Sequence, residues 1–193
     1  MRKLTRTAAP DCLQSNAVKW ADDYVKSRAS NPKSKFSWRD DACYQAIRET
    51  LARMTQKHCA FCDGELGVVS RVTVEHFRPK KTFPKLAYTW DNLFPCCDLC
   101  QSIKLERFDD ALLKPDTEDY AFNKYFTVNY HTGAIEISQS AELAAQAKAR
   151  ITSDLYGLNT TERRKARIRE WERFSRAKAP CIDDYSYRFF LEY

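Results

Sequence analysis

The chain has 193 residues, 44% of them hydrophobic and 30% charged, a composition typical of a globular protein with one compact domain. It has only four glycines and no Gly-x-x-x-x-Gly-Lys sequence, which excludes ATP binding by a P-loop. The net charge of +6 suits a polyanionic partner such as nucleic acid.

No signal-peptide pattern and no apolar run near the roughly 18 residues of a membrane span is present, so we expect a cytoplasmic protein without membrane contact. In that reducing compartment the eight cysteines should be thiols or metal ligands rather than disulfides. Three of them stand alone in the sequence, and we expect these to be small buried hydrophobic residues: Cys12, Cys43 and Cys181.

The first third of the chain predicts an arm followed by two helices. Residues 1–14 are basic and unpatterned, which indicates a loose arm. A short helix is expected over 15–28 and a better one over 40–56, where apolar residues recur at three- and four-residue steps. Asp40 or Asp41 can cap the start of the second helix.

The middle of the chain predicts a strand, a basic loop and a helix. Residues 68–77 are rich in valine, which favours a β-strand, and Pro79 ends it. Residues 78–92 combine basic and aromatic side chains in a loop. Residues 92–105 then predict a turn that leads into a helix.

The last third predicts a hairpin and two helices. Alternating residues over 126–137 favour a β-hairpin, and 142–158 favours a helix. Asn159 and Glu162 resemble a capping box for a final helix that ends near residue 178. That helix is dense in arginine, and we expect its charges on a solvated face, or against phosphates or an acidic partner.

Two Cys-x2-Cys pairs, separated by 34 residues, predict a metal site. The pairs are Cys59 with Cys62 and Cys97 with Cys100, and four thiolates are the usual ligands of a tetrahedral structural zinc. Cys96 could replace Cys97, but only Cys97 gives the two-residue spacing, so we favour Cys97.

Glu75 and His76 lie between the two cysteine pairs and carry residue types suited to hydrolysis. A neutral imidazole can take a proton from water, and a carboxylate can hold a hard cation that stabilises charge on a phosphate. Neighbours on a regular strand point to opposite faces, so the two side chains can cooperate only if the strand is irregular there or if metal and water lie on different sides of one phosphate. The alternative for His76 is a structural histidine or an additional zinc ligand. Basic residues nearby could anchor phosphates: Arg78, Lys80, Lys81 and Lys104.

The order Cys-x2-Cys, Glu-His, Asn-Leu, Cys-x2-Cys over residues 57–107 resembles the zinc-stapled HNH endonucleases. The resemblance implies a ββα-metal fold with His76 as general base and Asn92 as the residue that braces the loop. It implies that Glu75 and Gln101 hold a catalytic Mg²⁺ or Mn²⁺. Gln101 stands where that family usually has histidine or asparagine, so the longer amide is a departure.

Over a wider part of the chain, inside and beyond this core, the sequence resembles the PtuB-like HNH proteins of Septu-type and retron anti-phage systems. The motifs that carry the resemblance are Glu75-His76-Phe77-Arg78-Pro79-Lys80, Tyr88-Thr89-Trp90-Asp91-Asn92-Leu93, Leu113-Lys114-Pro115-Asp116, Thr132-Gly133-Ala134-Ile135 and Leu155-Tyr156-Gly157-Leu158-Asn159. The resemblance implies phage defence beside a PtuA-like ATPase.

The prediction is therefore an α+β protein of one domain, residues 1–193, with an HNH nuclease core at 57–107 and helical flanks at 15–56 and 141–178. Its expected activity is hydrolysis of phosphodiester bonds, in DNA before RNA. Two alternatives remain open: a non-catalytic zinc module that binds nucleic acid or a protein, and a ribonuclease of the same fold.

Overall fold

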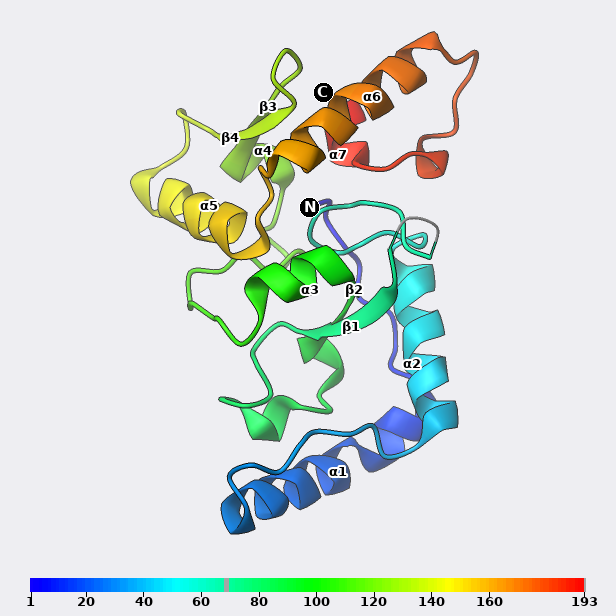
Figure 1. Ribbon diagram of the computed structural model, residues 1–193, viewed down its shortest axis with the longest axis vertical. Coiled ribbons are helices and arrows are strands. Elements are labelled where there is room, and N and C mark those ends of the chain that lie inside the picture. The colour runs from blue at the N-terminus through cyan, green and yellow to red at the C-terminus, as the bar shows by residue number, and fades with distance from the viewer. Residues whose placement is uncertain (68–69, 193) are drawn as a thin grey trace.

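The computed structural model describes residues 1–67 and 70–192, which form an elongated α+β protein (Figure 1). The helices are α1 (Asp11–Ser30), α2 (Asp41–Met54), α3 (Asp98–Lys104), α4 (Phe122–Tyr125), α5 (Leu143–Tyr156), α6 (Thr161–Arg176) and α7 (Arg188–Leu191). The strands are β1 (Val72–His76), β2 (Leu93–Cys97), β3 (Phe126–Asn129) and β4 (Ala134–Ile137), and short 3-10 turns are η1 (Pro84–Leu86), η2 (Trp90–Asn92) and η3 (Ile182–Asp184). Helix α1 lies at one end of the molecule, β1, β2 and α3 in the middle, and α5 and α6 toward the other end.

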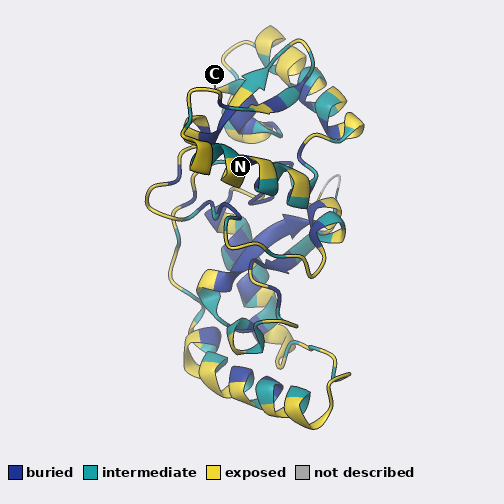
Figure 2. Ribbon diagram, turned by 90° about the vertical axis from the view of Figure 1, so that its left-hand side faces the viewer, coloured by how far each residue is buried: buried dark blue, intermediate teal, exposed yellow. Residues whose placement is uncertain are grey.

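Strands β1 and β2 form an antiparallel pair at the centre of the molecule, and α3 follows β2 directly. The register places Glu75 opposite Phe94 and His76 opposite Leu93. All five residues of β2 and the last three of β1 are buried, so the central strands are largely dark blue in Figure 2. The expected strand at 68–77 is confirmed for 72–76, while its residues 68 and 69 lie outside the described part.

The sequence did not predict β2, because its pattern has no alternation. Both faces of this strand are covered, so its side chains are uniformly apolar or cysteine rather than alternating. The expected turn over residues 92–97 is therefore wrong, and the helix begins only at Asp98. The thiol of Cys97 caps it by accepting a hydrogen bond from the Cys100 backbone N–H.

The N-terminal segment is part of the core and not a loose arm. Met1 and Leu4 are buried, and the guanidinium of Arg6 binds Asp116 with an Nε–Oδ2 distance of 2.9 Å. The same guanidinium lies 4.3 Å from the centre of the Phe94 ring. The expectation failed because the three anchoring side chains follow no helix or strand period.

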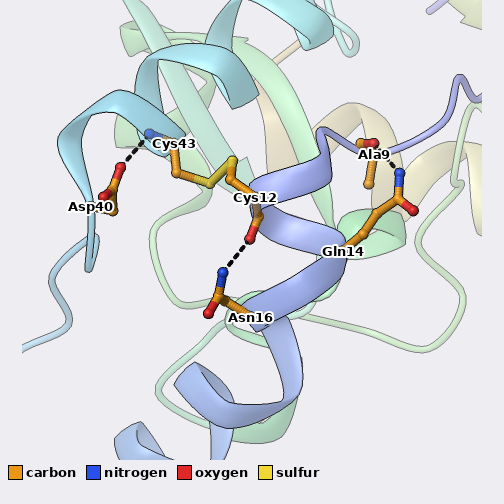
Figure 3. The surroundings of a disulfide bond; sticks show 6 residues. All are labelled: Ala9, Cys12, Gln14, Asn16, Asp40 and Cys43. Carbon is orange, nitrogen blue, oxygen red and sulfur yellow. Dashed lines mark hydrogen bonds between the residues drawn. A yellow bond between two sulfur atoms is a disulfide. The ribbon is translucent and has the colours of Figure 1, made fainter.

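A disulfide joins the starts of α1 and α2, contrary to the expectation of free thiols (Figure 3). The Cα atoms of Cys12 and Cys43 are 5.8 Å apart, within the range that a disulfide spans. Asp40 caps α2 beside the bond, as expected, by accepting from the Cys43 backbone N–H. The expectation of free thiols came from the reducing compartment assumed for the protein. Which thiols meet is decided by how the two helices pack. Cys181 is exposed rather than buried.

The second half of the chain confirms the expected hairpin and helices with one change of cap. Strands β3 and β4 pair as predicted, and α6 begins after Thr160, whose hydroxyl accepts from the Arg163 N–H. Asn159 instead exchanges two hydrogen bonds with the Ile135 backbone. Gly157, at φ +56°, ends α5, and a Cβ there would lie 2.6 Å from an Ile103 carbon.

Over the described ranges 1–67 and 70–192, none of the helices combines the length and the apolar character that crossing a bilayer requires.

Candidate functional site

Four buried cysteines lie together in a cluster that could hold a metal ion such as zinc. The sulfur atoms of Cys59, Cys62, Cys97 and Cys100 all lie within 4.8 Å of one another, and those of Cys62 and Cys97 are 3.7 Å apart. A zinc ion with bonds of about 2.3 Å to four sulfurs places those sulfurs about 3.8 Å apart, so the cluster fits tetrahedral zinc. Cys96 is buried but lies outside the cluster, as favoured from the spacing.

Neighbouring thiols favour ionisation of two members of this cluster. Hydrogen bonds, first from Cys100 and then from Cys59, lower the pKa of Cys97 to about 4. A hydrogen bond from Cys100 is also the largest effect on Cys62 and lowers its pKa. Burial raises the pKa of Cys100. Thiolates are the form that binds a metal, so the lowered pKa values of Cys97 and Cys62 favour metal binding at this cluster.

The imidazole of His76 is held in one tautomer at the end of β1. Its Nε2 lies 2.8 Å from the carbonyl oxygen of Ala87, which can only accept, so Nε2 carries the hydrogen and Nδ1 carries the lone pair. Burial, together with the charges of Lys80 and Lys104, lowers the pKa of His76 to about 3. The ring is therefore neutral, with its basic nitrogen at Nδ1.

Two aromatic residues from the segment between α1 and α2 pack on this imidazole. The ring of Phe36 meets it edge-on at 5.1 Å, and the ring of Trp38 stacks on it at 5.9 Å. These contacts fix the plane of the ring. They also explain why His76 is only 4% exposed.

Asn92 fixes the loop that supplies the carbonyl partner of His76. Its side-chain oxygen accepts from the Arg78 backbone N–H at 2.7 Å, and its amide donates to the carbonyls of Arg78 and Leu86, each at 3.0 Å. Leu86 directly precedes Ala87. The amide of Asn92 thus joins Arg78, just after the end of β1, to Leu86, which precedes the hydrogen-bond acceptor of His76.

Glu75 is buried beside His76 and forms an ion pair that the sequence did not predict. Its Oε1 accepts from the Lys104 ammonium at 2.8 Å, and the same ammonium donates to the His76 carbonyl at 3.1 Å. Burial raises the pKa of Glu75. Lys104 and the amide of Gln101 act in the opposite direction but do not cancel this effect. Lys104 is completely buried, so the expectation that it binds nucleic acid at the surface is wrong.

Glu75, His76, Lys80 and Gln101 line one hollow of about 240 Å³ between β1 and α3. Although Glu75 and His76 are neighbours on β1, both border this hollow, because the strand ends at His76. The amide of Gln101 donates to the Val74 carbonyl at 3.2 Å. The Glu75 carboxylate and the Gln101 amide oxygen would be the protein ligands of a cation here. So small a number of protein ligands suits Mg²⁺, which keeps several waters.

Of the three basic residues predicted to bind phosphates in the loop, Lys80 lines this hollow, and the three differ in exposure. Arg78 is exposed, faces Asp110 at 3.6 Å and lies over the ring of Phe83. Lys80 is half-buried, and Lys81 is exposed. Their roles toward phosphates stay predictions.

Only part of the basic face expected on α6 is exposed to solvent. Arg163 and Arg167 are buried, so the expected solvated face does not include them. Arg163 contacts the sulfurs of Cys97 and Cys100, and Arg167 donates to the carbonyls of Gly133 and Leu158. Sequence spacing gives no signal for the contact of Arg163 with these sulfurs, since Cys97 and Cys100 lie more than 60 residues away.

Two characterised proteins resemble the chain in sequence. It is 39% identical to the Septu protein PtuB of Bacillus thuringiensis over 59 residues, which are 30% of this chain and 23% of that protein. It is 32% identical to the Septu protein PtuB of Bacillus mycoides (strain KBAB4) over 120 residues, 52% of this chain and 39% of the relative. By sequence, the chain is PtuB-like. The matched regions thus span less than half the length of either relative. The chain matches no protein-family model.

We expect the purified protein to contain one zinc per chain, bound by the four clustered cysteines. Replacing Cys59 and Cys97 together by serine should remove both the zinc and the folded structure, because structural zinc contributes directly to folding. Metal analysis with circular dichroism measures both. Cys96→Ala is the matched control and should keep its zinc. A soluble, folded Cys59→Ser/Cys97→Ser protein without zinc would contradict the assignment.

We expect Lys104→Met to lower the free energy of unfolding by about 3–5 kcal/mol, because it leaves the buried Glu75 carboxylate without its partner. Denaturant titration measures the loss. The double variant Glu75→Gln/Lys104→Met should recover most of it, since neither charge is then buried. A single variant as stable as the wild type would show that Glu75 has another source of compensation.

Proposed function

We propose that the chain is a metal-dependent HNH endonuclease that hydrolyses phosphodiester bonds, DNA before RNA, with the four cysteines holding a structural zinc. The observation that carries the proposal is the state of His76. Its Nε2 is bound to a carbonyl, its Nδ1 has the lone pair, and it borders the same hollow as Glu75 and Gln101. The order β1, β2, α3 agrees with the ββα-metal core that the motifs imply.

In this proposal His76 takes the proton of the attacking water at Nδ1. The Ala87 carbonyl keeps Nε2 protonated, and the rings of Phe36 and Trp38 fix the orientation of the imidazole ring. Asn92 holds the loop that carries the acceptor. Ordering of this kind lets a general base act without reorganisation of its surroundings.

Glu75 and Gln101 are the residues that would hold Mg²⁺ or Mn²⁺, which stabilises charge on the phosphate and on the leaving oxygen. Lys104 fixes the orientation of the Glu75 carboxylate by one hydrogen bond. The basic residues Arg78, Lys80 and Lys81 would hold phosphates beside the cut.

A second candidate is a zinc module that binds nucleic acid or a protein without cleaving. The Lys104–Glu75 ion pair favours it, because the ammonium already neutralises the carboxylate that a catalytic cation needs. The two candidates differ in one observable, cleavage in the presence of a divalent metal.

We expect the protein to nick or cut plasmid DNA with Mg²⁺ or Mn²⁺, and we expect His76→Ala to reduce the rate by at least about 10²–10⁴-fold, the usual contribution of a general base. The exposed residue His131 provides the control, since His131→Ala should cleave normally. Zinc content and circular dichroism should match in both variants. Undiminished cleavage by His76→Ala would exclude the mechanism, and no cleavage of DNA or RNA by the wild type would favour the zinc module.

The similarity to PtuB also supports a place in Septu-type phage defence, with a PtuA-like ATPase as partner. We propose that the exposed part of α6 takes part in that contact, because it presents several cations: Lys165, Arg169, Arg173 and Arg176.

We expect the chain to co-purify with a PtuA-like ATPase, and we expect Lys165→Glu/Arg176→Glu to weaken the complex by charge repulsion. Zinc content should not change, because both side chains are exposed and away from the cysteine cluster. Lys19→Glu/Lys26→Glu on α1 is the comparison, with the same number of reversed exposed charges. A chain that elutes alone from a mixture with the ATPase would contradict the partnership.

A further inference from the structure

A buried arginine from the second half of the chain reaches the cysteine cluster. Nη2 of Arg163 lies 3.0 Å from the sulfur of Cys100 and 3.7 Å from that of Cys97. The residue is only 3% exposed, so these contacts are shielded from water. Nothing in the cysteine motif predicts such a donor, because Arg163 stands 63 residues beyond Cys100.

The other nitrogen of the same guanidinium holds the joint between α5 and α6. Nη1 donates to the carbonyl of Tyr156 at 2.5 Å and to that of Gly157 at 2.8 Å. These are the orphan carbonyls at the end of α5, which need a donor. The ring of Tyr156 also stacks on Phe61 of the first cysteine pair, with centroids 3.9 Å apart. The planar guanidinium therefore joins metal-ligand sulfurs to the helix joint.

The charges explain why an arginine is needed at this place. Four thiolates around one Zn²⁺ carry a net charge of −2, and a buried charge is costly unless it is paired. A fixed guanidinium supplies a positive charge and two oriented donors, and it stays charged when buried. Hydrogen bonds to ligand sulfurs also reduce their basicity and orient them around the metal.

We propose that Arg163 is a positioning residue of the zinc centre, which stabilises the bound metal and makes docking of the α5–α6 joint depend on it. The proposal rests on the zinc site proposed above. In this proposal the metal stabilises the β1–β2–α3 unit and, through Arg163, also holds the C-terminal helices to the core.

The structure offers a matched control one helical turn further on. Arg167 is also a buried arginine of α6 and also anchors the helix, by donating to the carbonyls of Gly133 and Leu158. Its hydrogen bonds include none to a sulfur among the described residues. A variant of Arg167 therefore loosens α6 without removing a donor from the metal ligands.

A hollow of about 480 Å³ gives reagents access to this side of the cluster. Cys62, Cys97 and Arg163 are among its lining residues. A chelator or an alkylating reagent can therefore approach the ligand sulfurs where the guanidinium lies. Loss of Arg163 should expose the sulfurs and raise their nucleophilicity.

The test compares Arg163→Met, Arg163→Lys and Arg167→Met with the wild type, all loaded with zinc. We expect Arg163→Met to release zinc to a chromogenic chelator about 10–100-fold more readily, the usual loss for a partner of a metal ligand. Alkylation of the cysteines by iodoacetamide should accelerate with it. Arg163→Lys keeps the charge and should lie between Met and the wild type.

Cobalt substitution supplies a readout that stability alone does not move. The thiolate-to-cobalt charge-transfer band should shift in Arg163→Met, because the sulfurs lose two hydrogen-bond donors, and should stay in place in Arg167→Met. If Arg163→Met does not fold, Arg163→Lys carries the same comparison. Equal zinc release from Arg163→Met and Arg167→Met, with an unchanged cobalt band in either Arg163 variant, would overturn the proposal. A wild type without zinc would instead overturn the zinc assignment itself.

Discussion

Four cysteine sulfurs lie within 4.8 Å of one another and join the two chain segments that carry the candidate site. The first pair follows α2, and the second pair spans the end of β2 and the start of α3. Bringing the pairs together places α3 against β1 and leaves Glu75 and Gln101 on one hollow. The same cluster receives Arg163 and stands beside the Phe61–Tyr156 stack, so the C-terminal helices also depend on it.

Two buried ion pairs join distant segments of the chain beside its hydrophobic core. Lys104 pairs with Glu75 inside the site, and Arg188 binds Asp63 with an Nη2–Oδ1 distance of 2.7 Å at the first cysteine pair. Each pair joins segments distant in the sequence. Such pairs contribute little net stability compared with apolar packing, but losing one partner is costly, and they define one arrangement of the segments. In the proposed hydrolysis, this rigidity would keep His76 and Glu75 in a fixed arrangement.

The grouping of the cysteines and the cap of α2 followed from the sequence, because both rest on short spacings. The two-residue spacing of the cysteines selected Cys97 over Cys96, and the aspartate before α2 indicated its cap. The adjacency of Glu75 and His76 placed both at one strand end. What the spacing could not show was which other residues these side chains contact. Lys104 appeared to be a surface cation, and it is the buried partner of Glu75.

The sequence by itself determined which four cysteines cluster, the position of β1, the β3–β4 hairpin and the extents of α2 and α6 to within a few residues, because each rests on a short motif or a periodic pattern within one segment. Only the tertiary structure decided that β2 is a strand, that residues 1–6 enter the core, that Cys12 meets Cys43 and that Arg163 reaches the cluster. These features join residues from about 30 to more than 60 positions apart, or bury both faces of a strand. Helix and strand periods describe one element at a time, so no periodic pattern records which elements meet.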